Sequence, residues 1–326
     1  MSERESKYKV LGGTVLLLIA AIIWGSAFVA QSTAMDHIGP FTMNGLRSLF
    51  AALFLFPTMY ASDKVRGKKP TFFGTTNPSE IKTLLKGGIL MGVLVTIAST
   101  MQQIGIISTT VGKAGFLTTL YIVIVPILGL FLKKKIGLSS WIAIILSLIG
   151  MYLLCITGSF SIGIGDLLMI GSAFFFAVHI LVIDAFSYRV SGLRLSFIQF
   201  VVCSFVCLVF ALIYERPEVE DIMSAMGSII WVGVFSAGIG YTLQILGQKY
   251  VPTHVAPLIM SLESVFSAIS GAIFLNEVMN NRESIGCILI FCGVILAQIP
   301  FDKILKKRKK RKKGQKLKTS KIKSRG

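Results

Sequence analysis

The sequence predicts an all-α, polytopic membrane protein with ten transmembrane helices, and three observations lead to this prediction. First, the 326 residues are 54% hydrophobic and only 15% charged, with a mean hydropathy of +0.76. Soluble domains carry about 25% charged residues, so this chain has too few charges to cover a surface that faces water. Second, apolar runs of about 20 residues, the length that crosses a bilayer, follow one another along the chain. Third, basic residues are distributed between these runs as the positive-inside rule requires.

Ten apolar runs are predicted to span the membrane, each as one helix. The first run is too long for the apolar core of a signal peptide, so we expect it to be retained. Connections are short except for the polar stretch 61–84, which is predicted to be a loop. Pro126 removes one backbone hydrogen bond and is predicted to kink the fourth helix. The predicted helices are residues 11–32, 40–60, 85–107, 113–132, 138–157, 166–186, 195–214, 227–247, 254–275 and 283–301.

The placement of Lys and Arg predicts the orientation of the chain. If the basic C-terminal tail is inside, only Lys113, Arg216 and Arg282 of the 33 Lys and Arg residues fall in outside segments, and Arg47 lies within a span. Nine or eleven spans would destroy this asymmetry. We therefore expect a multi-pass protein of the plasma membrane with both termini in the cytoplasm.

The net charge of +18 comes mainly from the terminal tract Lys303–Arg325, which contains no Asp or Glu. We interpret this tract as a cytoplasmic tail that fixes the topology and contacts anionic lipid headgroups, each basic residue near the membrane contributing about 1 kcal/mol. No aromatic residue interrupts the tract to stack on bases, so nucleic-acid binding is not expected.

The sequence gives no sign of a metal site, a cofactor or an enzyme. The five cysteines lie in apolar runs without a C-x-x-C motif and are interpreted as packing residues. His37, His179 and His254 are predicted near the outside, in mid-membrane and near the inside, so they cannot converge on one metal ion. No nucleophile elbow, zinc-protease motif or phosphate-binding loop occurs.

The two halves of the chain resemble each other when the fourth predicted helix is laid over the ninth. Tyr121 then falls opposite Glu263, and Lys135 falls opposite Glu277. Lysine at the inner position and glutamate at the outer one agree with the predicted orientation. The matching positions are Ala114 and Ala256, Thr119 and Ser261, Leu120 and Leu262, and Gly129 and Gly271.

This internal similarity predicts two inverted repeats. Each half contains five spans, an odd number, so the two halves insert in opposite senses. Such an architecture is typical of secondary transporters, whose substrate site lies between the repeats near the midplane. The predicted organisation is a cytoplasmic segment 1–10, repeats at 11–157 and 158–301, and a polybasic tail at 302–326.

Glu263 is the strongest candidate for a functional residue, because an ionisable group inside a bilayer is costly. It lies near the middle of the ninth predicted helix, and Ser267 and Ser270 follow on the same face. Two interpretations stay open. Glu263 is either a site for a proton or a substrate cation in a wet cavity, or a protonated or hydrogen-bonded carboxyl that locks helix packing.

His179 and Arg47 are also placed inside predicted spans. His179 either shuttles protons or binds substrate, as histidine can near physiological pH, or packs between helices with a hydrogen bond. Arg47 either holds an anionic group of the substrate or has a structural role, reaching toward the membrane surface or capping a neighbouring helix. The structural role is favoured for Arg47.

Polar and aromatic stripes on other helices favour a cavity, although such stripes also occur as hydrogen-bonded seams between helices. Gln103 ends a polar stripe on the third helix, Gln244 lies between Tyr241 and Gln248 in a stripe on the eighth, and Trp24 shares a face with Phe28 and Gln31 on the first. The candidate cavity residues are Glu263, His179, Trp24, Tyr121, Gln244, Gln103 and Arg47.

Several short motifs, taken in their order and spacing, resemble one family of membrane proteins. They are Trp24-Gly25-Ser26 with Phe28, Arg47, the run Lys113–Thr118 continuing to Pro126, Gly165-Asp166, and the run Ser261–Phe266 with Gly271 and Glu277. Over residues 11–300 the chain is similar to the drug/metabolite transporter superfamily, specifically to EamA-domain proteins. The resemblance implies ten helices in two inverted repeats, a central cavity, alternating access, and export or exchange of amino acids or other metabolites. It also implies acidic positions at Glu263 and Glu277.

Three positions depart from the pattern of that family. Ser264 replaces the usual proline after Glu263, Lys135 stands where the first repeat often has an acid, and Phe176 replaces a frequent tryptophan. These departures leave the implied fold intact and leave the substrate open.

The residues and the resemblance together predict a secondary transporter of small metabolites (amino acids, drugs or related solutes) that works as an exporter by alternating access. Its expected partners are a small-molecule substrate and membrane lipids. Glu263 is predicted to exchange a proton as the repeats rock. Two alternatives remain: a membrane-embedded lipid-modifying enzyme, for which no catalytic cluster is found, and a scaffold without transport, which would have no wet cavity at Glu263.

Overall fold

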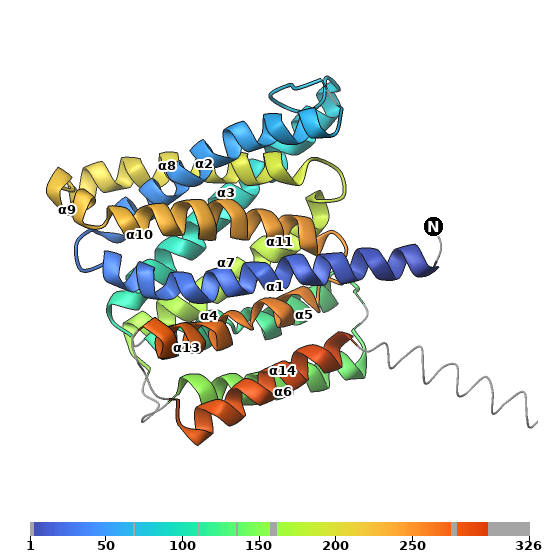
Figure 1. Ribbon diagram of the computed structural model, residues 1–326, viewed down its shortest axis with the longest axis vertical. Helices are drawn as coiled ribbons and strands as arrows, with labels where there is room; N and C mark the ends of the chain where they lie inside the picture. The colour runs from blue at the N-terminus through green and yellow to red at the C-terminus, as the bar shows by residue number, and fades with distance from the viewer. Residues whose placement is uncertain are drawn as a thin grey trace, which may run out of the picture.

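The computed structural model describes residues 3–67, 69–109, 111–134, 136–156, 162–274 and 279–298. Every regular element within these residues is a helix, and none of them is a strand. The helices lie side by side as a bundle (Figure 1). The N-terminal part of the chain and the connection 66–77 lie at one end of the bundle, which we name the loop end; the opposite end, which carries residues 219–224, is the far end.

Seven long helices make up most of the bundle, and shorter helices complete it. The long helices are α1 (Glu3–Ala34), α2 (Pro40–Val65), α3 (Pro78–Ile107), α6 (Leu138–Cys155), α7 (Ile164–Phe186), α8 (Gly192–Phe210) and α14 (Asn281–Gln298). The shorter helices are α4 (Val111–Thr118), α5 (Tyr121–Phe131), α9 (Val219–Ser224), α10 (Met226–Ile230), α11 (Tyr241–Gln248), α12 (Ala256–Met260) and α13 (Glu263–Phe274). Two segments are π-helical: Ala211–Glu215, which continues α8, and Trp231–Gly240, which joins α10 to α11.

The bundle has the surface of a multi-pass membrane protein. Eight helical segments of the described chain are long and apolar enough to cross a membrane. Large apolar side chains face outward from several of them: Phe131 is 80% exposed, Phe205 is 70% exposed and Ile295 is 60% exposed. An exterior that exposes so many large apolar side chains is suited to contact with lipid rather than with water.

Two helices extend further into the polar stretch 61–84 than predicted. α2 ends at Val65 rather than at residue 60, and α3 begins at Pro78 rather than at residue 85. Local signals set this start, because the Asn77 side chain accepts a hydrogen bond from the Ser79 N–H, and proline at the first position has no N–H to leave unsatisfied. The predicted loop is therefore too long, since hydropathy marks only the apolar part of a helix.

The fourth and ninth predicted helices are each interrupted near the middle, where single continuous helices were predicted. α4 ends at Thr118 and α5 begins at Tyr121; α12 ends at Met260 and α13 begins at Glu263. The two interruptions fall at corresponding places, because Tyr121 and Glu263, which are 142 residues apart, each begin the second half-helix.

Hydroxyl side chains, rather than proline, mark both interruptions. The Thr119 hydroxyl donates to the carbonyl of Gly115, and the Ser261 hydroxyl donates to the carbonyl of Leu258, both at 2.8 Å. These side chains compete with backbone N–H groups for helical carbonyls, which weakens a helix locally. Pro126 lies within α5. The predicted kink at Pro126 therefore does not coincide with the interruption, which comes before it.

Two close contacts between glycines each join a helix of the first half of the chain to a helix of the second half. Gly13 of α1 packs on Gly247 of α11 so tightly that a Cβ on Gly13 would lie 2.8 Å from the Gly247 carbonyl oxygen. Gly105 of α3 packs on Gly165 of α7 in the same way, with 2.9 Å between a Cβ on Gly105 and the Gly165 carbonyl oxygen. Only glycine allows helix backbones to approach this closely.

Candidate functional site

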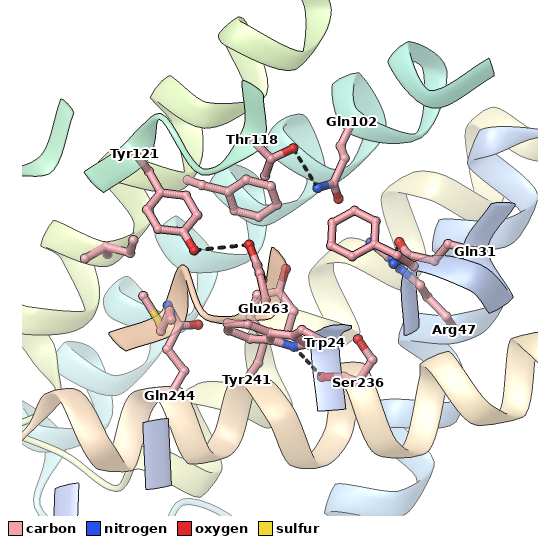
Figure 2. Close-up of a pocket in the computed structure, with 14 residues that line it drawn as sticks. Trp24, Gln31, Arg47, Gln102, Thr118, Tyr121, Ser236, Tyr241, Gln244 and Glu263 are labelled. Atoms are coloured by element: carbon pink, nitrogen blue, oxygen red, sulfur yellow. Dashed lines mark hydrogen bonds between the residues drawn. The ribbon is translucent and has the colours of Figure 1, made fainter. Parts of the chain in front are cut away.

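A cavity with a free volume of about 60 Å³ lies inside the bundle (Figure 2). A cavity needs roughly 10–15 Å³ of such volume to hold one water molecule, so this cavity is large enough to hold water. The chain segments that meet there come from both halves of the sequence. The lining residues are Trp24, Phe28, Gln31, Arg47, Gln102, Thr118, Tyr121, Phe176, Ile180, Ser236, Tyr241, Gln244, Met260 and Glu263.

A hydrogen bond joins the two half-helices at the cavity. The Tyr121 hydroxyl donates to Oε1 of Glu263 at 3.1 Å, and both residues are 5% exposed (Figure 2). Tyr121 is the first residue of α5, and Glu263 is the first residue of α13. The backbone hydrogen bonds continue through each interruption in a tighter pattern, since the N–H of Ile122 donates to the Thr119 carbonyl and the N–H of Ser264 donates to the Ser261 carbonyl. The side chains of Tyr121 and Glu263 therefore supply the polar link between the two interruptions.

Trp24 forms an aromatic wall of the cavity together with Tyr241. The two rings pack edge to face with their centroids 5.1 Å apart. The indole N–H of Trp24 donates to the backbone carbonyl of Ser236 at 3.1 Å (Figure 2). Gly240 makes this contact possible, because a Cβ there would lie 2.6 Å from the Trp24 Nε1. The indole is thus fixed against the π-helical segment.

Arg47 brings a positive charge to the cavity. It is 7% exposed, and its Nη1 donates to Oε1 of Gln31 at 2.7 Å. Within the described part of the chain, no ion pair is formed by Arg47. A buried guanidinium without a carboxylate partner is costly, so this position is suited to an anionic group of a bound molecule.

Gln102 and Thr118 line a further part of the cavity. The Gln102 amide donates to the Thr118 hydroxyl at 3.2 Å (Figure 2). Thr118 is the last residue of α4, directly before the first interruption. The cavity is therefore bounded by both interruptions and by polar groups from α1, α2 and α3.

The sequence of this bundle matches one known family twice. The EamA-like transporter family matches residues 11–156 and again residues 163–298. The chain belongs to the EamA-like transporter family. It is accordingly a multi-pass membrane protein of a transporter family, and neither the family nor the names of its relatives point to an enzyme.

Relatives of this family member carry transporter names over nearly their whole length. A protein of Archaeoglobus fulgidus named uncharacterized transporter is 27% identical over 284 residues, which is 87% of this chain and 84% of the relative. The uncharacterized transporter YetK of Bacillus subtilis is 24% identical over 304 residues, 89% of this chain and 88% of the relative. YwfM of the same organism, also named uncharacterized transporter, is 22% identical over 297 residues, 87% and 92% of the two chains.

A solved structure shares the fold. It superposes with a TM-score of 0.70 over 88% of this chain and 96% of the other, at 16% sequence identity, and it is named only "Crystal structure of protein". At this identity the likeness shows a common architecture and nothing about the substrate.

Five of the predicted site residues line the cavity of this EamA-like transporter. They are Glu263, Trp24, Tyr121, Gln244 and Arg47. The structure thus brings together residues from α1, α2, α5, α11 and α13, and their roles in binding stay predictions.

His179 and Gln103 are buried and do not line the cavity. His179 is fully buried on α7 with its Nε2 3.0 Å from Oε1 of Gln199, which corresponds to the packed histidine of the second interpretation. Gln103 is fully buried, and its amide donates to the carbonyl of Gln31 at 3.5 Å. On α3 it is the preceding residue, Gln102, that faces the cavity. Successive helical residues point in directions about 100° apart, and a spacing pattern does not fix which one faces inward.

Several lining residues were missed as candidates. Thr118 stands beside an interruption, and its neighbour Thr119 was noticed only as a repeat match. Ser236 has its backbone carbonyl bonded to Trp24 at the wall of the cavity, in a π-helical segment, so its side-chain pattern carries no signal. Phe28, Gln31 and Tyr241 belong to the polar and aromatic stripes on α1 and α11, so those stripes could have identified them as lining residues. The remaining missed residues are Gln102, Phe176, Ile180 and Met260.

Some predicted features lie outside the described residues. They are Lys135, Glu277, the boundary between residues 157 and 158, and the basic tract Lys303–Arg325.

Proposed function

We propose that this protein is a secondary transporter of small metabolites that exports its substrate across the plasma membrane by alternating access. The observation that carries the proposal is the hydrogen bond between Tyr121 and Glu263. It joins two residues at corresponding positions of the two halves, each at the start of a half-helix and each lining the buried cavity. Secondary transporters bind their substrates at interrupted helices between inverted repeats.

The architecture that we propose has ten membrane helices in two inverted repeats, residues 11–157 and 158–301. Eight of these membrane helices are the apolar segments described above. The other two are α2 and the interrupted pair α12 and α13, which together count as one span. The recurring glycine contacts, the paired interruptions and the double match to one family all support a duplicated five-helix unit. The start of α1 and the end of α14 then lie on the loop-end side of the membrane, which the basic residues of the sequence favour as the cytoplasmic side.

The cavity supports a substrate that carries charge. Arg47 offers a buried cation without an acidic partner in the described chain, and Glu263 offers an acid whose described side-chain partner is the neutral Tyr121. An anionic group of the substrate would bind at Arg47, and Glu263 would take up or release a proton as the repeats rock.

The test compares metabolites released by cells that express the unchanged protein, its Glu263→Gln variant or an empty vector. We expect at least one compound to be released only by the unchanged protein, and its release to depend on external pH. Glu220→Gln is the matched control, because it removes the same charge from an exposed position on α9. Release by Glu263→Gln at the wild-type rate and with the wild-type pH response would remove Glu263 from the mechanism.

Transport, rather than a scaffold role, requires that the cavity opens to water. A cysteine introduced at Gln244, after replacement of the five native cysteines, is expected to react with a polar maleimide and to be protected by substrate. A site that never reacts in folded protein, from either side of the membrane, would favour a scaffold without transport.

A further inference from the structure

A second cavity opens at the loop end, where the connection 66–77, the turn between α7 and α8, and the end of α11 meet. It is a cleft of about 340 Å³, larger than the central cavity, and the two share no lining residue. The proposed transport function does not require this cleft, so a ligand bound there would be independent of that function.

The cleft is positively charged. Arg66, Arg189 and Lys249 line it, and Arg194 lines it while paired with Asp63. Beyond this ion pair, one further acid lines the cleft, Glu80 in the first turn of α3. Three cations therefore face one acid, and the excess favours an anionic ligand.

The N-terminus of α8 opens into the same cleft. α8 has 19 residues, its N-cap residue Ser191 makes no hydrogen bond from its side chain, and its first turn holds no acid. Ser191, Gly192 and Leu193 line the cleft. The first N–H groups of a helix are free donors, and together with the positive end of the helix they bind tetrahedral anions.

A buried hydroxyl supplies a second, independent signal. Ser187 lines the cleft and is 2% exposed, yet its Oγ has no hydrogen-bond partner among the described residues. Buried polar groups are nearly always hydrogen-bonded, so an unpartnered one next to an open volume indicates a missing partner. A ligand oxygen in the cleft would provide it.

We propose that this cleft binds a phosphoryl group. The Ser187 hydroxyl and the N–H groups at the start of α8 would hold its oxygens from within, and the exposed guanidinium of Arg189 would cover it from the rim. Guanidinium groups bind phosphate through two parallel hydrogen bonds, which a monatomic halide cannot accept in the same way. The phosphoryl group belongs either to an anionic lipid headgroup or to a free phosphate of the aqueous phase.

Thermal unfolding of the purified full chain in a neutral detergent distinguishes these sources. One arm titrates inorganic phosphate against chloride at equal ionic strength; the other adds phosphatidylglycerol against phosphatidylcholine to the micelle. A rise in the midpoint with phosphate identifies a free phosphate, and a rise with phosphatidylglycerol alone identifies a headgroup. No rise in either arm overturns the proposal.

Variants place the effect in the cleft. We expect Arg189→Gln to weaken the apparent affinity about tenfold and Ser187→Ala about threefold, as the loss of a charged and of a neutral hydrogen bond. Arg189 is exposed, so its exchange leaves folding intact. Ser187→Ala is informative because removal of an unpartnered hydroxyl would not lower the midpoint without ligand. Arg282→Gln, which removes the same charge from the first turn of α14, is the control. Wild-type responses in both cleft variants, or an equal loss in Arg282→Gln, would assign the effect to the general positive charge of the chain and overturn the site.

Discussion

At each end of the helix pair α2 and α8, an acidic residue near the end of one helix binds the first turn of the other helix. The groups that the acid binds differ between the two ends. These helices lie side by side and run in opposite directions (Figure 1). At the loop end, Asp63 near the end of α2 accepts from Arg194 in the first turn of α8, with 2.5 Å between Oδ2 and Nη2. At the far end, Glu215 just after α8 accepts from the backbone N–H groups of Phe41 and Thr42 in the first turn of α2, both at 2.7 Å.

The four positions correspond to one another. The separation from Thr42 to Arg194 along the chain equals that from Asp63 to Glu215, as the proposed duplication would produce for one contact that joins the two halves twice. Its two copies now differ. The acid at the loop end binds a side-chain cation, whereas the acid at the far end binds a helix N-terminus and the Thr42 hydroxyl, at 2.6 Å.

This difference predicts that the two contacts contribute unequally to the stability of the fold. Side chains of Arg194 and Asp63 are 4% and 8% exposed, and Arg194 also donates to the carbonyls of Thr71 and Phe72, so it holds the connection 66–77. Glu215 is only partly buried. Separating two buried charges costs far more than releasing a carboxylate from a helix end that water can reach. The loop end should therefore be the firmer closure.

The largest expected effect is at the loop end. Asp63→Ala leaves the Arg194 guanidinium buried without its acid and is expected to lower the free energy of unfolding by about 3–5 kcal/mol. Unfolding of the detergent-solubilised protein by denaturant measures this loss. The double variant Asp63→Leu with Arg194→Met removes both charges and should recover most of it. If Asp63→Ala lowers the free energy of unfolding by less than about 1 kcal/mol, as for an ion pair on the surface, the pair of Asp63 and Arg194 is not buried in solution.

A smaller effect is expected at the far end. Glu215→Ala removes the acceptor for the first turn of α2 and should cost about 1–2 kcal/mol, the range for loss of a helix cap. The same denaturant measurement applies, with Glu218→Ala in the neighbouring exposed segment as the control. If Glu215→Ala proves as costly as Asp63→Ala, the two ends are equally firm and the comparison fails.

The sequence predicted the apolar helices but not the two contacts that Asp63 and Glu215 make between α2 and α8. Hydropathy is a property of single segments, so it located the apolar helices. The orientation, which rests on the placement of Lys and Arg, stays a prediction. The pairing of Asp63 with Arg194, across 131 residues, depends on how α2 packs on α8. Arg194 was counted only as a basic residue near the inside. Thr42 and Arg194 differ in chemistry, so the internal similarity of the sequence gives no signal that the two positions correspond.

The candidate site was predicted in part for a related reason. Depth in the membrane singles out Glu263 and Arg47, because a charge at mid-membrane is conspicuous in any sequence. Which of two adjacent residues faces the cavity, Gln102 or Gln103, depends on the rotation of α3 about its axis, and neighbouring helices set that rotation. A backbone carbonyl at the wall, as at Ser236, carries no side-chain signal at all.

The smallest expected effect is a dependence of stability on pH that arises at the loop end and not at the far end. His254 lies at the loop end between α11 and α12, where burial and the nearby Lys134 cation lower its pKa below the usual 6.5. Below that value the unfolded chain binds a proton that the folded chain resists, so the contribution of His254 to stability is present above about pH 6.5 and is lost as the pH falls.

The thermal midpoint of the wild type should accordingly fall between neutral and mildly acidic pH, and His254→Gln should fall less because its side chain cannot take up the proton. The matched exchange His37→Gln, in the exposed turn at the far end, is the control. An identical fall in the wild type and in His254→Gln would show that acid acts elsewhere, and the carboxylate of Asp63 would be the next group to test. A fall confined to proteins that retain His254 would mean that the loop end, the firmer closure at neutral pH, is also the one that acid weakens.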